Sequence, residues 1–437
     1  MVIHCILFLN FSLAVGMAAA SQPLPWPDRN GPTFDGRAAD EDGKDVPIEW
    51  DEATGRNVAW KIPVDGRGHS TPVIGLGRIW FTAATEDGTR QYVVCVDAET
   101  GEVLHRRLLF ENPDPEPLGN TFNTYASPTC ALEPDAVYVH FGTYGTARLD
   151  PATAETVWQR RDIHCRHFRG PGSSPVLFGE LLILTLDGID QQFLTALDKR
   201  TGETVWRTDR STDFKDLDPD GNPRLEGDYR KAYGTPGLAE VDGRTQVVSV
   251  GARAAFGYDA LTGKEIWTIE HEDYNAAIRP LFLPSLVILN TGSRGSNQMA
   301  VRLDASTRGN VTGTHVVWQR TRGNPHLPTP VLVDGRLYGA ANPGVLYCLD
   351  ARTGAELFSE RLRGPYTASP VYADGRIYFC NEDGEVLVIR ASDQFELLAR
   401  NKLTGQFRAS PAIADGALYL RSFDHLIKIA APPSRSE

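Results

Sequence analysis

The chain has 437 residues, of which 41% are hydrophobic, and its formal net charge at pH 7 is −12. This charge argues against a general partnership with nucleic acid or with an anionic membrane surface, because both need a cationic protein surface. The 41 glycines and 29 prolines follow no short period. Together with the apolar content, they indicate a folded protein rich in turns.

The first twenty residues have the pattern of a secretory signal peptide. An apolar segment extends through Val15, and Ala18-Ala19-Ala20 stands ahead of Ser21 as a small-residue cleavage pattern. Because no Lys or Arg stands near Met1, an uncleaved N-terminal anchor is the alternative. No other segment is long enough to span a membrane. We therefore expect an exported protein, periplasmic or extracellular, without an integral membrane domain.

Residues 21–53 show neither strand nor helix periodicity. They begin with a stretch rich in Pro and Gly and continue into the acidic stretch Asp40–Asp45. We predict an extended N-terminal arm that lies on the body of the protein and is anchored by Trp26.

A unit of four short strands recurs over residues 54–431. Its clearest copy, Thr329–Phe358, has apolar runs separated by Asp334-Gly335 and Asn342-Pro343-Gly344, which are residue types that make tight turns. Each unit opens with Ser-Pro, Thr-Pro or a related dipeptide, and the eight opening prolines are Pro72, Pro128, Pro175, Pro236, Pro280, Pro330, Pro370 and Pro411. Four strands in a repeat of this length are typical of a propeller blade.

The two ends of the repeat region complete each other. The eighth unit has only three strands after Pro411, and an unpaired strand over residues 54–62 precedes the first unit. Pairing the two leaves no free sheet edge. The sequence therefore predicts an all-β fold, an eight-bladed β-propeller of four-stranded antiparallel blades whose last blade is closed by an N-terminal strand. Residues 432–437 are expected to form a disordered tail.

Three units close with an aspartate, a Thr-Gly turn and an aromatic residue, as in Asp198…Thr201-Gly202…Trp206, and degenerate versions of this motif close four others, at His105, Trp158, Trp318 and Leu398. This motif resembles the tryptophan-docking repeat of pyrroloquinoline quinone (PQQ) repeat propellers, which include quinoprotein alcohol dehydrogenases and BamB-like outer-membrane assembly proteins. The arm motif from Trp26 to Pro32, with residues 67–72, resembles a secreted branch common in planctomycete-type bacteria. The resemblance implies that each docking aromatic packs between neighbouring blades and that the Ser/Thr-Pro strand is innermost.

An innermost Ser/Thr-Pro strand places the residues ahead of the prolines around one mouth of the central channel. Several of these positions, and others close by, carry rings or cationic groups, which suit an anionic or planar ligand. The candidate ligand-binding residues are His69, Tyr125, His167, Arg169, Tyr233, Arg279, His326, Tyr366 and Arg408. A merely wet, polar channel mouth is the alternative interpretation.

Two segments contain residue types that bind metals. Asp216, Asp218 and Asp220 with Gly221 have the spacing of a calcium loop, but Gly227 stands where such a loop carries glutamate. His164, Cys165 and His167 match no standard zinc spacing, and a plain surface loop is the simpler interpretation. A structural calcium ion is thus a hypothesis, and no cofactor is required by the sequence.

The sequence contains no nucleophile elbow, phosphate-binding loop or dinucleotide fingerprint, and we assign no catalytic residue. We expect a non-enzymatic, monomeric binding or scaffolding propeller of the cell envelope, with an envelope protein or a small ligand at the channel mouth. The alternative is an oxidoreductase that depends on PQQ and calcium. Quinoprotein dehydrogenases carry adjacent cysteines that form a disulfide, and this chain has no Cys-Cys pair.

Overall fold

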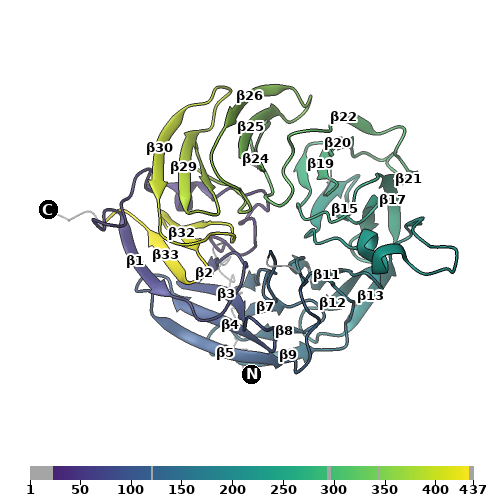
Figure 1. The fold of residues 1–437 in the computed structure, drawn as a ribbon, viewed down its shortest axis with the longest axis horizontal. Coiled ribbons are helices and arrows are strands. Elements are labelled where there is room, and N and C mark those ends of the chain that lie inside the picture. Colours follow the sequence, from purple (N-terminus) through teal and green to yellow (C-terminus); the bar gives the residue numbers. More distant parts are fainter. Residues whose placement is uncertain (1–22, 120–121, 293–296, 343, 433–437) are drawn as a thin grey trace, which may run out of the picture.

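The computed structural model describes residues 23–119, 122–292, 297–342 and 344–432. Eight sheets follow one another in chain order around a ring, which confirms the predicted eight-bladed β-propeller (Figure 1). The predicted signal peptide, residues 1–20, lies outside the described residues, as do residues 433–437 of the predicted tail.

Each blade is an antiparallel sheet whose first strand lies nearest the centre of the ring (Figure 1). Blade 1 contains β2 (Val73–Gly75), β3 (Arg78–Ala84), β4 (Arg90–Asp97) and β5 (Val103–Glu111). Blade 2 contains β6 (Ala131–Glu133), β7 (Ala136–His140), β8 (Thr146–Leu149) and β9 (Thr156–Arg160). Blade 3 contains β10 (Val176–Phe178), β11 (Leu181–Asp187), β12 (Gln192–Asp198) and β13 (Thr204–Asp209). Blade 4 contains β14 (Gly237–Val241), β15 (Arg244–Val250), β16 (Ala254–Asp259) and β17 (Glu265–Glu270).

The second half of the ring repeats this order. Blade 5 contains β18 (Leu281–Leu283), β19 (Leu286–Asn290), β20 (Gln298–Arg302) and β22 (Val316–Arg320). Blade 6 contains β23 (Val331–Val333), β24 (Arg336–Ala341), β25 (Val345–Asp350) and β26 (Glu356–Arg361). Blade 7 contains β27 (Val371–Ala373), β28 (Arg376–Cys380), β29 (Glu385–Arg390) and β30 (Leu397–Lys402). Blade 8 contains β31 (Ala412–Ala414), β32 (Ala417–Arg421), β33 (His425–Ile429) and, from the N-terminal side, β1 (Val58–Pro63).

Local sequence explains the tight turns after the innermost strands. Asp334 and Gly335 have φ values of 49° and 77°, and the Asp-Gly pairs of blades 7 and 8 have similar values. Both central residues of a type I′ hairpin turn need a positive φ, which Asp and Gly tolerate better than most residues. The Asp-Gly turns thus fix the register of the inner hairpins in blades 6 to 8.

The ring is closed by strands from opposite ends of the chain. β1 pairs antiparallel with β33, with Val58 opposite Ile429 and Pro63 opposite His425. The buried Arg421 adds a second tie, since its Nη1 donates to Ser70 Oγ at 2.7 Å and to the Thr82 carbonyl at 2.9 Å in blade 1. The predicted closure is therefore confirmed.

The core lies between the blades. All seven residues of β11 are buried, whereas β26 at the rim is mostly exposed. Some rim aromatics reach the next blade: the indole N–H groups of Trp158, Trp206 and Trp318 donate to main-chain carbonyls there at 3.0–3.2 Å. The junction between blades 4 and 5 differs, because β21 (Gly309–Asn310) instead pairs in parallel with β17 of blade 4.

A belt of hydrogen bonds joins the innermost strands at one end of the channel. In most blades, a main-chain N–H just ahead of the strand donates to a Ser or Thr hydroxyl of the next blade. These donor–acceptor distances are 2.9–3.2 Å. In blade 5 the belt position is Arg279, whose side chain instead forms an ion pair with Asp28 of the arm.

The arm crosses the channel. Trp26 pairs with Ile74 of β2 in blade 1, Asp28 binds Arg279 in blade 5, and Gly36 accepts from Tyr372 of β27 in blade 7. The acidic stretch then forms the single helical turn α1 (Asp40–Gly43), where the sequence predicted extended chain. Contacts of α1 with β27 and β31 place this turn beside blades 7 and 8.

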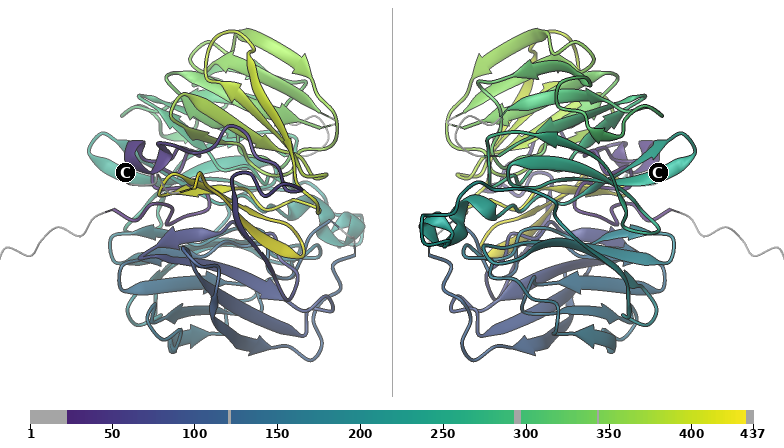
Figure 2. Two further views of the ribbon diagram at one scale, coloured as in Figure 1. Left: turned by 90° about the vertical axis from the view of Figure 1, so that its left-hand side faces the viewer. Right: turned by 90° about the vertical axis from the view of Figure 1, so that its right-hand side faces the viewer.

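The two short helices mark the two faces of the ring. The purple α1 and the teal 3-10 element η1 (Arg224–Arg230) project on opposite sides in Figure 2. The arm therefore leaves the channel at the face opposite η1. We call the face of α1 the closed end and the face of η1 the mouth.

Candidate ligand site at the channel mouth

The mouth opens into a cavity of about 560 Å³. Every blade contributes to its wall the residue that lies four positions before the innermost strand: His69, Ser127, Gly172, Tyr233, Ala277, Leu327, Thr367 and Arg408. Other segments complete the lining with Arg29, Thr71, Phe122, Asn123, Arg169, Asp228, Lys231, Asn275, His326, Asn342 and Ser410. A volume of this size suits a small organic ligand.

Five of the nine predicted binding residues line the cavity, namely His69, Arg169, Tyr233, His326 and Arg408. Counting three residues back from each opening proline finds the lining position in seven blades. It fails in blade 2, because Pro128 lies three residues before β6 instead of one. Tyr125 consequently falls two residues too early, and Ser127 takes the lining position.

The other four predicted residues lie away from the cavity. Tyr125 donates its hydroxyl to the Glu116 carbonyl at 3.0 Å. His167 is buried and accepts the Thr143 N–H at its Nε2, also at 3.0 Å. The remaining two are fully buried: Tyr366 lies in a core shared by blades 6 and 7, and Arg279 is held by the arm.

The positions that sequence reasoning missed come from segments outside the repeat. Arg29 belongs to the arm, Phe122 to the connection between blades 1 and 2, and Asp228 and Lys231 to the insertion around η1. A repeat pattern assigns no position in space to such residues. The one available signal was Arg279, which stands where the other blades carry Ser or Thr and which needs an acidic partner when buried.

The cavity is cationic although the whole chain is acidic. Four of its lining side chains are basic, namely Arg29, Arg169, Lys231 and Arg408, and one is acidic, Asp228. A concave site with an excess of one charge concentrates the field and attracts ligands of the opposite charge. The geometry therefore favours an anionic ligand.

Arg29 differs from the other three cations. Within the described residues it has neither an ion pair nor a hydrogen bond. Burial and the nearby charge of Arg279 lower the pKa of its guanidinium from 12.5 to about 10, against the opposing charge of Asp28. The folded protein thus holds a positive charge where the surroundings disfavour it.

Lys231 and Arg169 form one basic pair. The Lys231 ammonium group contacts the Asp228 carboxylate and donates to the Asp228 carbonyl at 3.0 Å. Burial and the charge of Arg169 lower the pKa of Lys231, while the contact with Asp228 favours its charged form. Arg169 uses Nη1 to donate to the Gly119 carbonyl at 2.6 Å, and its remaining N–H groups give it further donor capacity.

Arg408 lies beside a neutral histidine. Its Nε donates to Glu382 at 3.0 Å and its Nη1 to the Phe122 carbonyl at 2.9 Å. Burial, Arg408 and Arg421 lower the pKa of His69 to about 3, so this ring is uncharged at neutral pH. His69 stacks on Phe423 with ring centroids 5.5 Å apart.

The metal hypotheses find no converging ligands. Among the described residues, no group of three or more His, Cys, Asp or Glu side chains could hold a metal ion. In the suggested calcium loop, Asp216 binds Arg230 through both oxygens at 2.8–2.9 Å. Asp218 accepts the main-chain N–H groups of Asp220 and Asn222.

Comparison with known proteins gives a family match. The family model described as "Outer membrane protein assembly factor BamB" matches residues 24–186, 190–328 and 310–394. No curated protein matches the sequence significantly. None of the helices in the described part of the chain is long and apolar enough to cross a membrane.

Solved structures share the fold at low sequence identity. BamB from Moraxella catarrhalis is 14% identical, with a TM-score of 0.58 over 85% of this chain and 99% of that one. A europium-containing methanol dehydrogenase is 12% identical, with a TM-score of 0.67 over 93% and 91%. A quinohemoprotein alcohol dehydrogenase from Comamonas testosteroni is 14% identical, with a TM-score of 0.63 over 96% and 82%. At such identities these matches carry the fold alone.

Proposed function

The chain belongs to the family described as outer membrane protein assembly factor BamB, and from this premise we propose that it is an exported, non-enzymatic binding propeller of the cell envelope. Its binding site is the cavity at the mouth, and its occupant is a small ligand or a segment of an envelope protein. The observation that carries this proposal is the cavity itself, to which all eight blades contribute and which carries four cations.

The quinoprotein alternative meets part of its requirements in the same cavity. PQQ is a planar tricarboxylate, and Arg29, Arg169 and Arg408 would hold its carboxylates. When bound, PQQ supplies a quinone that accepts electrons from an alcohol. The residues present therefore suit the charge of PQQ.

The alternative lacks support for the proton transfer. Alcohol oxidation needs a base to accept the hydroxyl proton, and Asp228 is the only carboxylate among the described lining residues. Its contact with Lys231 makes it a poor base. The five cysteines of the described chain are buried and unpaired, and none of them lines the cavity. These features favour binding over catalysis.

The experiment is a turnover assay joined to a stability measurement. Mature protein from Ser21 onward is loaded with PQQ and calcium and assayed for alcohol oxidation with an artificial electron acceptor. We expect no turnover above that of PQQ and calcium alone. Turnover that is lost in Arg408→Gln would overturn the proposal and establish the oxidoreductase.

The stability measurement tests for a bound ligand. The thermal midpoint is recorded with PQQ plus calcium, with calcium alone, and with extracts of small envelope metabolites. A ligand present at 100 times its Kd stabilises the fold by about 2.7 kcal/mol. We expect at least one midpoint rise without turnover, which Arg408→Gln reduces. If no sample raises the midpoint, a small-ligand site at the mouth is wrong.

A further inference from the structure

We propose that the ligand of the mouth cavity is a small molecule with at least two anionic groups, carboxylate or phosphate, and that one of these groups binds Arg29 of the N-terminal arm. This inference rests on the proposed function and specifies the ligand class of the same site. It also gives the arm a second role besides crossing the channel.

Arg29 has no hydrogen-bond or ion-pair partner among the described residues. The neighbouring carboxylate, Asp28, is already used by Arg279 and by the main-chain N–H of Asn30. Each of the other three lining cations has an acidic or carbonyl partner, but Arg29 has none among the described residues. Arg29 is partly buried, and a cation largely removed from water without a partner is costly. An anion in the cavity would supply the partner.

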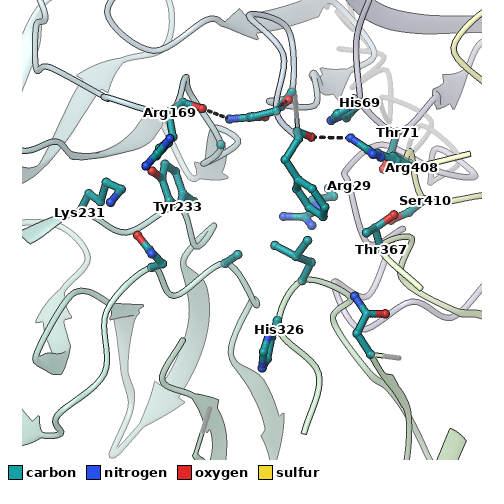
Figure 3. Close-up of a pocket in the computed structure, with 18 of the residues that line it drawn as sticks. Arg29, His69, Thr71, Arg169, Lys231, Tyr233, His326, Thr367, Arg408 and Ser410 are labelled. Carbon is teal, nitrogen blue, oxygen red and sulfur yellow. Dashed lines mark hydrogen bonds between the residues drawn. The ribbon is translucent and has the colours of Figure 1, made fainter. Parts of the chain in front are cut away.

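The four cations lie on different sides of the cavity. Arg169 and Lys231 lie on one side of the cavity, Arg408 lies on the opposite side, and Arg29 lies between them (Figure 3). A ligand with two or three anionic groups reaches Arg29 and a side wall together. Its charge-assisted hydrogen bonds are roughly twice as strong as those between neutral groups.

The rest of the cavity wall suits an anion that also carries neutral polar groups. His69 is uncharged, and burial raises the pKa of Tyr233, so its hydroxyl keeps its proton. Tyr233 Oη, Thr367 Oγ1 and His69 Nε2 have no hydrogen-bond partner in the described structure. Buried polar groups without partners are uncommon and often mark functional sites.

Binding at Arg29 couples the cavity to the arm. Trp26 and Asp28, which hold the arm in the channel, lie within three residues of Arg29. A ligand that bridges Arg29 and the blades therefore stabilises the arm in its crossing position. By reciprocity, loosening the arm weakens the ligand.

Calorimetry on the mature protein from Ser21 onward tests the inference at constant ionic strength. Citrate and pyrophosphate represent the carboxylate and phosphate sources, and acetate and inorganic phosphate are their single-group counterparts. We expect citrate or pyrophosphate to bind at least tenfold more tightly than its counterpart. If neither shows saturable binding, or if each only equals its counterpart, the inference is wrong.

Variants then identify the residue. We expect Arg29→Met to weaken the tighter probe by about 10- to 100-fold, as loss of a charge-assisted bond implies, and Arg29→Lys to restore part of the affinity. Arg37→Met is the matched control, because Arg37 lies in the same arm, pairs with Asp35 and does not line the cavity. Unchanged affinity in Arg29→Met, or an equal loss in Arg37→Met, would overturn the role of Arg29.

Amide hydrogen exchange gives an independent readout of the arm. We expect the tighter probe to slow exchange at residues 26–38 in the natural sequence and to have little effect there in Arg29→Met. Exchange that slows equally in both proteins would contradict the coupling. If PQQ supports turnover and the probes bind in an Arg29-dependent way, the proposed function is wrong but this inference stands. If the probes do not bind and there is no turnover, this inference is wrong but the proposed function stands.

Discussion

Two adjacent residues of the arm differ in how their charges are satisfied. In the belt that joins the innermost strands, the side chains of Arg279 and Asp28 pair with only 0% and 6% of their surfaces exposed. At the mouth, the next residue of the arm, Arg29, has no partner among the described residues. Two adjacent residues therefore have opposite roles: Asp28 fastens the arm, and Arg29 presents a charge to the cavity.

This difference separates architecture from function. Paired buried charges hold a structure in place, because removing one leaves the other uncompensated. An unpaired charge lowers stability and persists where a site needs it. Stability measurements on variants of Asp28 and of Arg29 should therefore show opposite signs.

The largest effect is expected from loss of the paired carboxylate. Asp28→Ala leaves Arg279 buried without an acidic partner and should lower the free energy of unfolding by about 3–5 kcal/mol. Chemical denaturation followed by tryptophan fluorescence measures this loss.

A second variant of the arm provides the control. Asp35 pairs with the more exposed Arg37, and burial raises the pKa of Asp35, so its ionised form gains little from the pair. We expect Asp35→Ala to change stability by less than about 1 kcal/mol. Equal losses in the two variants would show that the Asp28–Arg279 pair has no special role in holding the arm.

The opposite sign is expected one residue later. Arg29→Met keeps an unbranched side chain and removes a disfavoured charge beside Arg279. It should raise the free energy of unfolding by about 1–2 kcal/mol, within the range seen when buried charges are replaced by apolar groups. The same denaturation experiment measures it, and a loss of stability would mean that Arg29 has a stabilising partner in solution.

The contrast between the repeat and the arm also explains what the sequence could predict. The eight openings from Pro72 to Pro411 and the unpaired strand near Trp60 predicted the blade number and the closure, because repeats report local structure directly. The lining positions followed from the same register in seven blades. Only the displaced proline of blade 2 broke it, at Tyr125.

The arm could not be placed in this way. The pairing of Asp28 with Arg279 joins residues 251 positions apart, and no repeat relates them. Lys231 likewise comes from an insertion whose path depends on tertiary contacts. The residues that distinguish this propeller from a generic one therefore lie outside the repeat, where the sequence pattern cannot place them.

A smaller effect is expected from the pH dependence of the mouth. The pKa of His69 falls from 6.5 to about 3 in the folded protein. Between these values the unfolded chain binds a proton that the folded chain does not, so stability decreases as the pH falls below 6.5. His69→Asn should remove about 1 kcal/mol of the decrease between pH 6.5 and 5.5. His164→Asn, at an exposed site, should leave the profile unchanged, and identical profiles for all three proteins would contradict the assignment.

The smallest effect concerns the insertion at the rim of the mouth, whose carboxylates resemble Asp28 because they are already paired. Calcium binding there would have to compete with the ion pair between Asp216 and Arg230. It would also compete with the hydrogen bonds that main-chain N–H groups donate to Asp218. We therefore expect millimolar calcium to change the free energy of unfolding by less than about 0.5 kcal/mol, since an ion at or below its Kd stabilises only weakly. A larger calcium-dependent rise that Asp218→Ala abolishes would restore the calcium loop suggested by the sequence. It would also show that a paired carboxylate is no guide to ion binding in this fold.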